Sequence, residues 1–127
     1  MMKPLKILVL DDSEIVLNMT SLALTEAGYE VLAASSLVEF DQILSRVEPD
    51  LILTDIKMPE ISGDDVCRVL KQKYHTKLIP IVLFSTLEEK ELAALAERAG
   101  ADGFVSKNSG VEEIVKRIRE LTGEILF

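Results

Sequence analysis

The chain has 127 residues, of which 48% are hydrophobic and 28% are charged, and this balance indicates one globular domain and excludes a disordered segment. Its formal net charge of −8 disfavours contact with nucleic-acid phosphates, so we expect no direct nucleic-acid binding through this domain. The single cysteine, Cys67, cannot form an internal disulfide, as is typical of proteins in a reducing compartment. The first apolar run is followed by two aspartates and is too short for a signal peptide or a membrane span. Both observations indicate a cytoplasmic protein without membrane contact.

The first strand and the first helix are predicted near the N-terminus. Residues 5–10 form a nearly continuous apolar run, as in a strand that is buried on both faces. Ser13 is placed to cap a helix that ends near Ala27, where Gly28 follows. The apolar residues near one face of this helix, the face expected to pack on the core, are Ile15, Met19, Leu22 and Ala23.

Two further strands follow, with a helix between them. Residues 29–34 and residues 51–54 are rich in apolar and β-branched side chains, which predicts a strand in each. Between them, Ser36 and Glu39 have the spacing of a capping box, so we expect a helix over about residues 37–46.

The middle of the chain continues the same alternation. A third helix is predicted at about residues 64–74, and the apolar residues 80–84 predict a fourth strand. Thr86 and Glu89 form a second capping-box pair, which predicts a helix from there to Gly100.

The last strand and helix complete the pattern. Residues 103–106 predict a short fifth strand, and Ser109 with Glu112 forms a third capping-box pair. The helix that follows has an apolar face made of Val111, Ile114, Val115, Ile118 and Leu121. The residues after Gly123 are apolar.

Five strands and five helices in strict alternation predict an α/β fold, with a doubly wound parallel sheet and helices on both faces. The sequence contains no repeat, low-complexity stretch or internal linker. We therefore expect one domain over residues 1–127, with its core at about residues 4–121 and an apolar tail at residues 122–127.

Polar side chains cluster where the predicted strands end. In a doubly wound sheet, the carboxyl ends of the strands meet at a crevice in which ligands bind. Each residue alone has a structural explanation as a helix cap, a turn residue or a solvated lysine. An entirely structural origin does not account for the full set, because all members arrive at one edge: Asp11, Asp12, Asp55, Ser85, Thr86 and Lys107.

Three carboxylates at one edge repel one another, so at least one pKa should be raised unless a cation joins them. One lysine offsets only part of this charge, and a hard divalent ion with oxygen ligands, Mg²⁺, suits the site. A metal and Lys107 beside a carboxylate form a receptacle for a phosphoryl group. An ionised carboxylate such as Asp55 needs no general base to attack phosphorus, so the sequence is consistent with an aspartyl phosphate.

Four motifs resemble those of the response regulator receiver domains of bacterial two-component signalling, the family of the chemotaxis response regulator. They are VLDDSE, LTDIKMPEISG, PIVLFST and GADGFVSK, and the match extends to about Leu121. The resemblance implies a flavodoxin-like (βα)₅ fold with the strand order 2-1-3-4-5.

The resemblance also implies a role for each site residue. Asp55 corresponds to the phosphoacceptor, and Mg²⁺ would be bound by Asp11, Asp12 and Asp55 with the main-chain carbonyl of Lys57, Asp11 acting mainly through a water. The groups implied to assist or bind the phosphoryl group belong to Lys57, Ser85, Thr86 and Lys107. Ser85 and Phe104 occupy the switch positions, whose movement changes the face formed by the fourth helix, fifth strand and fifth helix.

Two positions depart from the family pattern. Asn108 follows Lys107 where the family usually has a proline, often after a cis peptide, so the path of the loop into the last helix is left open. Lys57 occupies a position that faces the path of attacking water in the family. We expect its side chain to alter the lifetime of the phosphoryl group, in a direction that the sequence does not give.

The function implied is a signalling switch that assists only its own phosphorylation and dephosphorylation. Its implied partners are a sensor histidine kinase or a phosphotransfer protein, and a downstream protein or fused output domain, with a homodimer through the switch face as a further possibility. A receiver-like module that docks without phosphorylation is an alternative, and so is a phosphohydrolase with an aspartyl nucleophile, although Lys57 stands where such enzymes carry a second aspartate. A flavodoxin-like cofactor carrier is disfavoured because the acidic DDSE loop repels phosphate.

Overall fold

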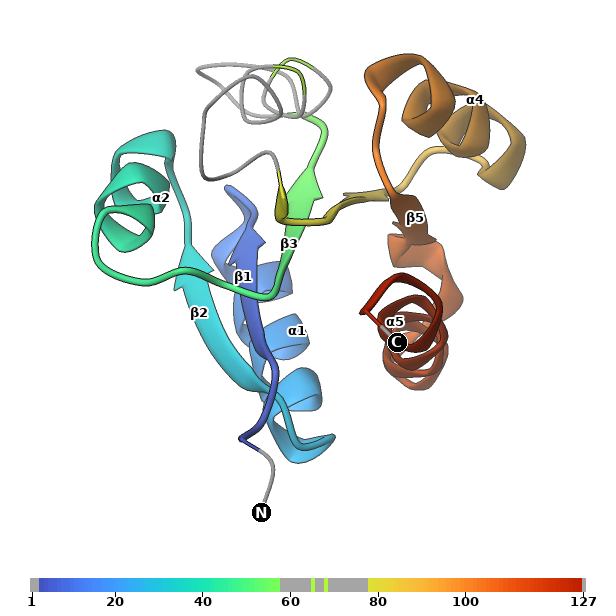
Figure 1. Cartoon of the computed structure of the whole chain (residues 1–127). Helices are drawn as coiled ribbons and strands as arrows, with labels where there is room; N and C mark the ends of the chain where they lie inside the picture. Colours follow the sequence, from blue (N-terminus) through green and yellow to red (C-terminus); the bar gives the residue numbers. More distant parts are fainter. Residues whose placement is uncertain (1–2, 58–64, 66–67, 69–77, 127) are drawn as a thin grey trace.

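The computed structural model of the chain describes residues 3–57, 65, 68 and 78–126. Five strands form one sheet in the order β2-β1-β3-β4-β5, and all neighbouring strands are parallel (Figure 1). This confirms the predicted sheet and its strand order. The strands are β1 (Lys6–Leu10), β2 (Glu30–Ala34), β3 (Leu51–Asp55), β4 (Ile81–Ser85) and β5 (Gly103–Ser106).

The helices of the described part of the chain are α1 (Glu14–Glu26), α2 (Leu37–Leu44), α4 (Glu89–Ala99) and α5 (Val111–Leu126), with a 3₁₀ turn, η2 (Lys107–Ser109), before α5. The helix predicted at residues 64–74 lies almost wholly outside the described residues, as does Cys67. Asp65 and Arg68 are described within that range, and both are helical and form an ion pair. None of the helices described here combines the length and apolar character that a membrane span requires.

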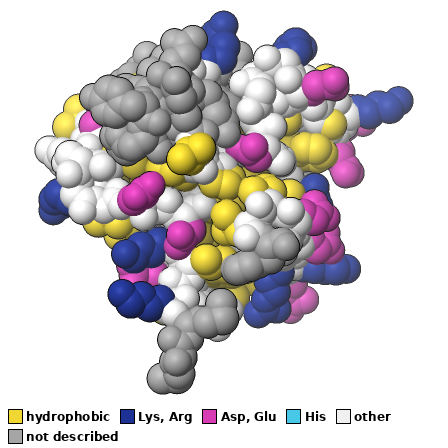
Figure 2. Space-filling view, in the orientation of Figure 1, with side chains coloured by type: hydrophobic (Ala, Val, Ile, Leu, Met, Phe, Trp, Pro, Cys, Tyr) yellow, Lys and Arg dark blue, Asp and Glu magenta, His cyan; other side chains and the backbone are white. Residues whose placement is uncertain are grey.

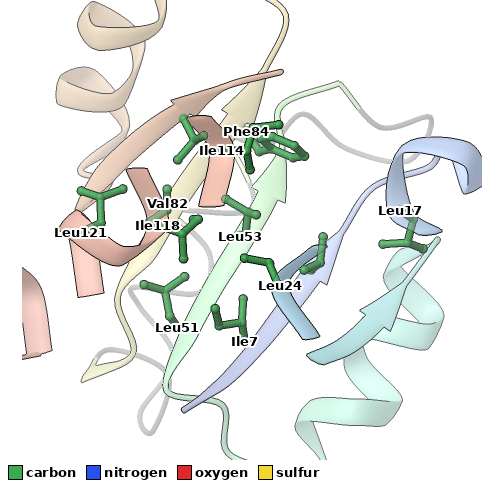
Figure 3. Close-up of a cluster of buried hydrophobic side chains, with 12 residues drawn as sticks. Ile7, Leu17, Leu24, Leu51, Leu53, Val82, Phe84, Ile114, Ile118 and Leu121 are labelled. Atoms are coloured by element: carbon green, nitrogen blue, oxygen red, sulfur yellow. The ribbon is translucent and has the colours of Figure 1, made fainter. Parts of the chain in front are cut away.

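Each face of the sheet has its own core, because alternate strand residues point to opposite faces. On one face, α1 and α5 cover a cluster that includes Leu24, Leu53 and Ile118 (Figure 3). On the other face, Phe40 of α2 packs with Ile52 of β3 in a second cluster. Strands β3 and β4 are buried along their whole length, so the residues at their ends stand on rigid supports.

The predicted buried face of α1 is wrong. Ile15, Met19 and Leu22 are among the large exposed hydrophobic residues of the protein, whereas Leu17 and Leu24 are buried in the core. The helix carries apolar side chains on more than one side, so periodicity alone offered two candidate faces. Packing against the sheet selects the face of Leu17 and Leu24 and leaves the other face in solvent.

The predicted caps of the first two helices are present. Ser13 Oγ accepts a hydrogen bond from the N–H of Val16 at 3.4 Å, and Ser36 Oγ accepts one from the N–H of Glu39 at 3.2 Å. The carboxylate of Glu39 accepts from the N–H of Ser35, at 2.7 Å, so the capping box is shifted by one residue on that side.

The caps predicted for the later helices are wrong. Thr86 does not cap α4, whose N-terminal flanking residue is Glu88, because the chain is still in a turn at Leu87. Ser109 ends the 3₁₀ turn η2 instead of capping α5, and Gly110 with a φ of 82° leads into that helix. Gly100 does end α4, in the left-handed conformation that glycine favours.

The C-terminal helix continues past the expected boundary. Helix α5 extends through Gly123 to Leu126, so most of the predicted apolar tail is helical. Thr122 is buried, and its Oγ1 lies 3.3 Å from the phenolic oxygen of Tyr29. Ile125 packs against the core. These contacts anchor the end of α5 beside the start of β2.

Candidate functional site

The polar residues predicted from the strand ends lie along the carboxyl edge of the sheet. Asp11 follows β1, Lys107 follows β5, and Asp55 and Ser85 are the last residues of β3 and β4. Asp55 is opposite Phe84 in the register of β3 and β4, so these ends lie at nearly the same level. The parallel topology therefore accounts for a site assembled from four separate segments.

Asp11 and Lys107 form the shortest ion pair of this edge. Lys107 Nζ lies 2.7 Å from Asp11 Oδ2, and the Asp11 side chain is fully buried. The other oxygen, Oδ1, accepts a hydrogen bond from the N–H of Ser13 at 2.9 Å. The aromatic ring of Phe84 lies beside this pair, with its centroid 5.1 Å from Lys107 Nζ.

Asp55 is nearly buried, with 7% of its surface exposed. Its Oδ1 lies 3.4 Å from Lys107 Nζ and accepts hydrogen bonds from the N–H groups of Ile56, at 2.8 Å, and Lys57, at 3.3 Å. Among the described residues, these hydrogen bonds and the ion pair all involve Oδ1. Oδ2 is therefore the oxygen left for an incoming group.

The pKa of Asp55 is raised above its ordinary value, chiefly because burial disfavours the charged carboxylate. The negative charge of Asp11 raises this pKa further. Lys107 and the N–H of Lys57 act in the opposite direction but do not cancel the effect of burial. The sequence predicted a raised pKa from repulsion among the carboxylates. The pKa of Asp55 is raised, but burial is the larger cause and the charge of Asp11 the smaller one.

Asp11, Asp12 and Asp55 bring carboxylate oxygens within 4.8 Å of one another, so the three can hold a metal ion. Hard oxygen donors of this kind fit Mg²⁺, which keeps several waters when it binds to a few carboxylates. Asp12 is exposed and Asp11 and Asp55 are buried, so the cluster opens to solvent on one side. The expected carbonyl ligand, that of Lys57, belongs to a residue whose N–H contacts Asp55 and whose side chain is exposed.

Ser85 and Thr86 flank the site at the end of β4. Ser85 is 3% exposed, and its Oγ accepts a hydrogen bond from the N–H of Leu87 at 3.0 Å. Thr86 is exposed, and its carbonyl accepts a hydrogen bond from Nδ2 of Asn108 at 2.8 Å. In the described part of the chain, Ser85 has no hydrogen bond with the acidic residues, so its own hydroxyl hydrogen is free to be donated.

Phe104 lies on β5 and is half buried, packed against residues of α4. The guanidinium of Arg117, on α5, lies 5.8 Å from the centroid of its ring. Both residues line a cavity of about 110 Å³, together with Glu89 of α4 and Glu113 of α5. Phe104, the residue expected at the aromatic switch position, is thus next to open space on the side of the protein formed by α4, β5 and α5.

Sequence reasoning missed three contacts of the site. Phe84 faces Lys107, Arg117 stacks near Phe104, and Asn108 bonds to the loop after β4. The position of Phe84 one residue before the end of β4 is a signal that could have been used, because alternation along a strand places it on the face of α1 and α5. The other two contacts depend on tertiary packing.

Charged side chains of both signs are scattered over the face drawn in Figure 2, and no continuous basic area appears there. This agrees with the formal net charge of −8.

Comparisons with known proteins match these features to one family. The family model described as "Response regulator receiver domain" matches residues 7–119. Among curated proteins, the transcriptional regulator RpaA of Synechocystis is 30% identical over 116 residues, and the phosphate regulon regulator PhoB of Pseudomonas aeruginosa is 33% identical over 113 residues. These alignments cover 91% and 89% of this chain but 48% and 49% of the relatives, so the chain spans about half their length.

Solved structures agree with this match. The chemotaxis response regulator CheY4 of Vibrio cholerae superimposes with a TM-score of 0.84 at 27% identity, covering 93% of this chain and 98% of its own. A response regulator described as putative from Chloroflexus aurantiacus superimposes with a TM-score of 0.84 at 30% identity, covering 95% of this chain and 99% of its own.

Proposed function

This chain belongs to the response regulator receiver domains of two-component signalling, and we propose that it is a phosphoaccepting switch whose acceptor is Asp55. The phosphoryl donor is the phosphohistidine of a sensor histidine kinase or of a phosphotransfer protein. The observation that carries the proposal is the carboxylate of Asp55, whose Oδ1 contacts Lys107 and two main-chain N–H groups while Oδ2 has none of these contacts.

In the proposed reaction, Oδ2 of Asp55 attacks the phosphorus atom in line with the departing imidazole nitrogen. An O–P bond forms, the P–N bond breaks, and the imidazole leaves with the electron pair and takes up a proton from solvent. Lys107 stabilises the charge on the equatorial oxygens, because its Nζ already lies within 3.4 Å of Asp55. No general base is required for an ionised carboxylate nucleophile.

We assign the Mg²⁺ ligands to Asp11, Asp12 and Asp55 with the carbonyl of Lys57, and Mg²⁺, when bound, supplies further positive charge beside the phosphoryl oxygens. Asp11 also fixes Lys107 by the 2.7 Å ion pair. The carboxylate of Asp11 is therefore both the ion-pair partner of Lys107 and a proposed ligand of Mg²⁺.

The switch that we propose begins at Ser85. Its hydroxyl turns toward the new phosphoryl oxygens, the N–H of Thr86 donates beside it, and Phe104 follows into the space that the Ser85 side chain vacates. The face formed by α4, β5 and α5 then changes and regulates its partner. This is a two-state equilibrium that the phosphoryl group biases by its charge and hydrogen bonds.

The output of the switch is a contact with a downstream protein or with an output domain fused to it. The relatives RpaA and PhoB carry names of transcriptional regulators and are about twice as long as the matched region, which supports the fused arrangement. We propose a cytoplasmic location, no direct nucleic-acid contact through this domain, and dimerisation through the switch face as one form of output.

The proposal is tested by intact-mass measurement after incubation with Mg²⁺ and acetyl phosphate. We expect the wild type to gain the mass of one phosphoryl group, and we expect no gain for Asp55→Asn or when EDTA removes the metal. A wild type that gains no phosphoryl group from acetyl phosphate or from a panel of kinases contradicts the proposal and favours a docking module. Continuous turnover of small phosphate esters favours a phosphohydrolase instead.

A further inference from the structure

Asn108 joins the two loops that border the site of Asp55. It lies in the 3₁₀ turn η2, and its Nδ2 donates to the main-chain carbonyl of Thr86 at 2.8 Å, across 22 positions of sequence. Its main-chain N–H donates to Ser106 Oγ at 3.1 Å, which fixes the turn on the side of β5. One residue therefore ties the loop after β4 to the segment that carries Lys107.

The loop after β4 is held at two points. Ser85 Oγ accepts from the N–H of Leu87 at 3.0 Å, which closes a tight turn around Thr86. The carbonyl of Thr86 is fixed from outside by Asn108. The orientation of this turn, including its N–H groups, is thereby set relative to the neighbouring Lys107.

Lys107 is in turn fixed by the acidic residues, through ion pairs of 2.7 Å with Asp11 and 3.4 Å with Asp55. A chain of contacts runs from the carboxylates through Lys107 and Asn108 to Thr86. In the described part of the chain, Asn108 itself has no hydrogen bond or ion pair with a carboxylate. Any effect of Asn108 on the site must pass through the two loops.

We propose that Asn108 is a positioning residue for phosphoryl binding, and this inference rests on the proposed function of Asp55. Its hydrogen bond to Thr86 holds the N–H donors of the loop after β4 at a fixed distance from the ammonium group of Lys107. The N–H donors and the ammonium group can then contact the same phosphoryl group. Donors that are already in place bind an anion more tightly than donors that must be ordered first.

The test compares binding of beryllofluoride, a phosphoryl analogue, with binding of Mg²⁺ alone, both by calorimetry. In Asn108→Ala and Asn108→Leu the side-chain donor is lost, and leucine keeps a similar shape. We expect beryllofluoride in the presence of Mg²⁺ to bind about fivefold more weakly to both variants, as for one lost hydrogen bond. Binding of Mg²⁺ alone stays as in the wild type, because Asn108 contacts no carboxylate.

Two further variants separate positioning from a general effect on the fold. Asn108→Gln retains an amide donor and recovers part of the affinity for beryllofluoride, while Asn18→Ala, which removes an exposed asparagine of α1, leaves it unchanged. Nuclear magnetic resonance supplies a readout that needs no ligand. The main-chain N–H signals of Thr86 and Leu87 shift in Asn108→Ala and Asn108→Leu, and the signals of the sheet do not.

Equal beryllofluoride affinity in the wild type, Asn108→Ala and Asn108→Leu overturns the positioning role while leaving the proposed function intact. A wild type that binds Mg²⁺ but neither beryllofluoride nor a phosphoryl group overturns the proposed function, and the positioning role with it. Asn108 is exposed, so the variants are expected to fold, and thermal melting checks this. If Asn108→Ala does not fold, Asn108→Leu gives the same comparison.

Discussion

Lys107 is held in place by Asp11, whose Oδ2 lies 2.7 Å from the lysine Nζ. Asp11 Oδ2 is buried, and among the described residues its polar contact is this ion pair with Lys107. The distance from Lys107 to Asp55 is longer, at 3.4 Å. The lysine is thus in position before any phosphoryl group arrives, and it is anchored by the carboxylate that is not the proposed acceptor.

The ion pair predicts a large loss of stability when its charge is removed. Lys107→Met keeps the apolar chain beside Phe84 but leaves Asp11 as a buried charge without its ion-pair partner. We expect the free energy of unfolding near neutral pH to fall by about 3 kcal/mol in metal-free buffer. Urea denaturation measures this. Lys90→Met, at an exposed position of α4, is the matched control with a change of about 0.5 kcal/mol or less. Equal stability of both variants contradicts the account.

The raised pKa of Asp55 predicts how stability depends on pH without metal. The folded-state pKa lies above the ordinary value of 3.8, mainly because of burial and then because of Asp11, so folding favours the protonated carboxyl. The resulting stabilisation is present below 3.8 and is lost as the pH rises through the folded-state pKa. Asp55→Asn is neutral at every pH, and we expect it to be more stable than the wild type near neutral pH.

Urea denaturation in EDTA over a series of pH values measures that difference. The advantage of Asp55→Asn should shrink as the pH falls through the folded-state pKa and then below 3.8, where Asp55 is protonated in both states. Added Mg²⁺ should also reduce it, because the metal binds the wild-type carboxylates and stabilises the folded state. A difference that is independent of pH would contradict the burial of an ionised Asp55.

Lys57 is predicted to control the lifetime of the phosphoryl group. Its N–H donates to Asp55 Oδ1 and its side chain is exposed, so this side chain belongs to a residue in contact with the acceptor and is open to solvent. We expect Lys57→Ala to shorten the lifetime about two- to fivefold by opening the path of water. Lys57→Met, which keeps the length without the charge, should decay as the wild type does. Decay of the phosphorylated protein, followed by intact mass after the donor is removed, measures both. An unchanged rate for Lys57→Ala refutes the prediction.

The face of α1 that packs on the sheet is tested by two leucines on the same helix. Leu24 is fully buried and Leu22 is 62% exposed. Leu24→Ala should lower the free energy of unfolding by about 3 kcal/mol, because it leaves a cavity in the core. Leu22→Ala should change it by about 0.5 kcal/mol or less. Equal losses in urea denaturation would mean that both faces of α1 are packed.

The sequence was sufficient to predict the sheet, because each strand is a short apolar run followed by a polar residue at the same edge. It was also sufficient to predict that Asp11, Asp55 and Lys107 lie close together, because the carboxyl ends of parallel strands lie at the same edge of the sheet. It was insufficient for the buried face of α1, where two apolar faces compete and only packing decides. It misplaced the start of α4 because Ser85 forms its hydrogen bond with the N–H of Leu87 in a turn that delays the helix.

The role of Asn108 could not be predicted from the sequence, because its partner is a main-chain carbonyl, that of Thr86, in a different loop. Nor does the sequence indicate the continuation of α5 to Leu126, which depends on Thr122 and Ile125 finding contacts on the core. The Lys107–Asn108 peptide, left open by the sequence, is trans, since the described residues contain no cis peptide.

Chemical trapping of the phosphorylated residue tests the central claim most directly. Borohydride reduces an aspartyl phosphate to homoserine, and peptide mass spectrometry then locates the modified position. After incubation with Mg²⁺ and acetyl phosphate, the account predicts homoserine at position 55 and at no other position. Homoserine at position 11 or 12, or a phosphorylated protein without any homoserine, would contradict Asp55 as the acceptor.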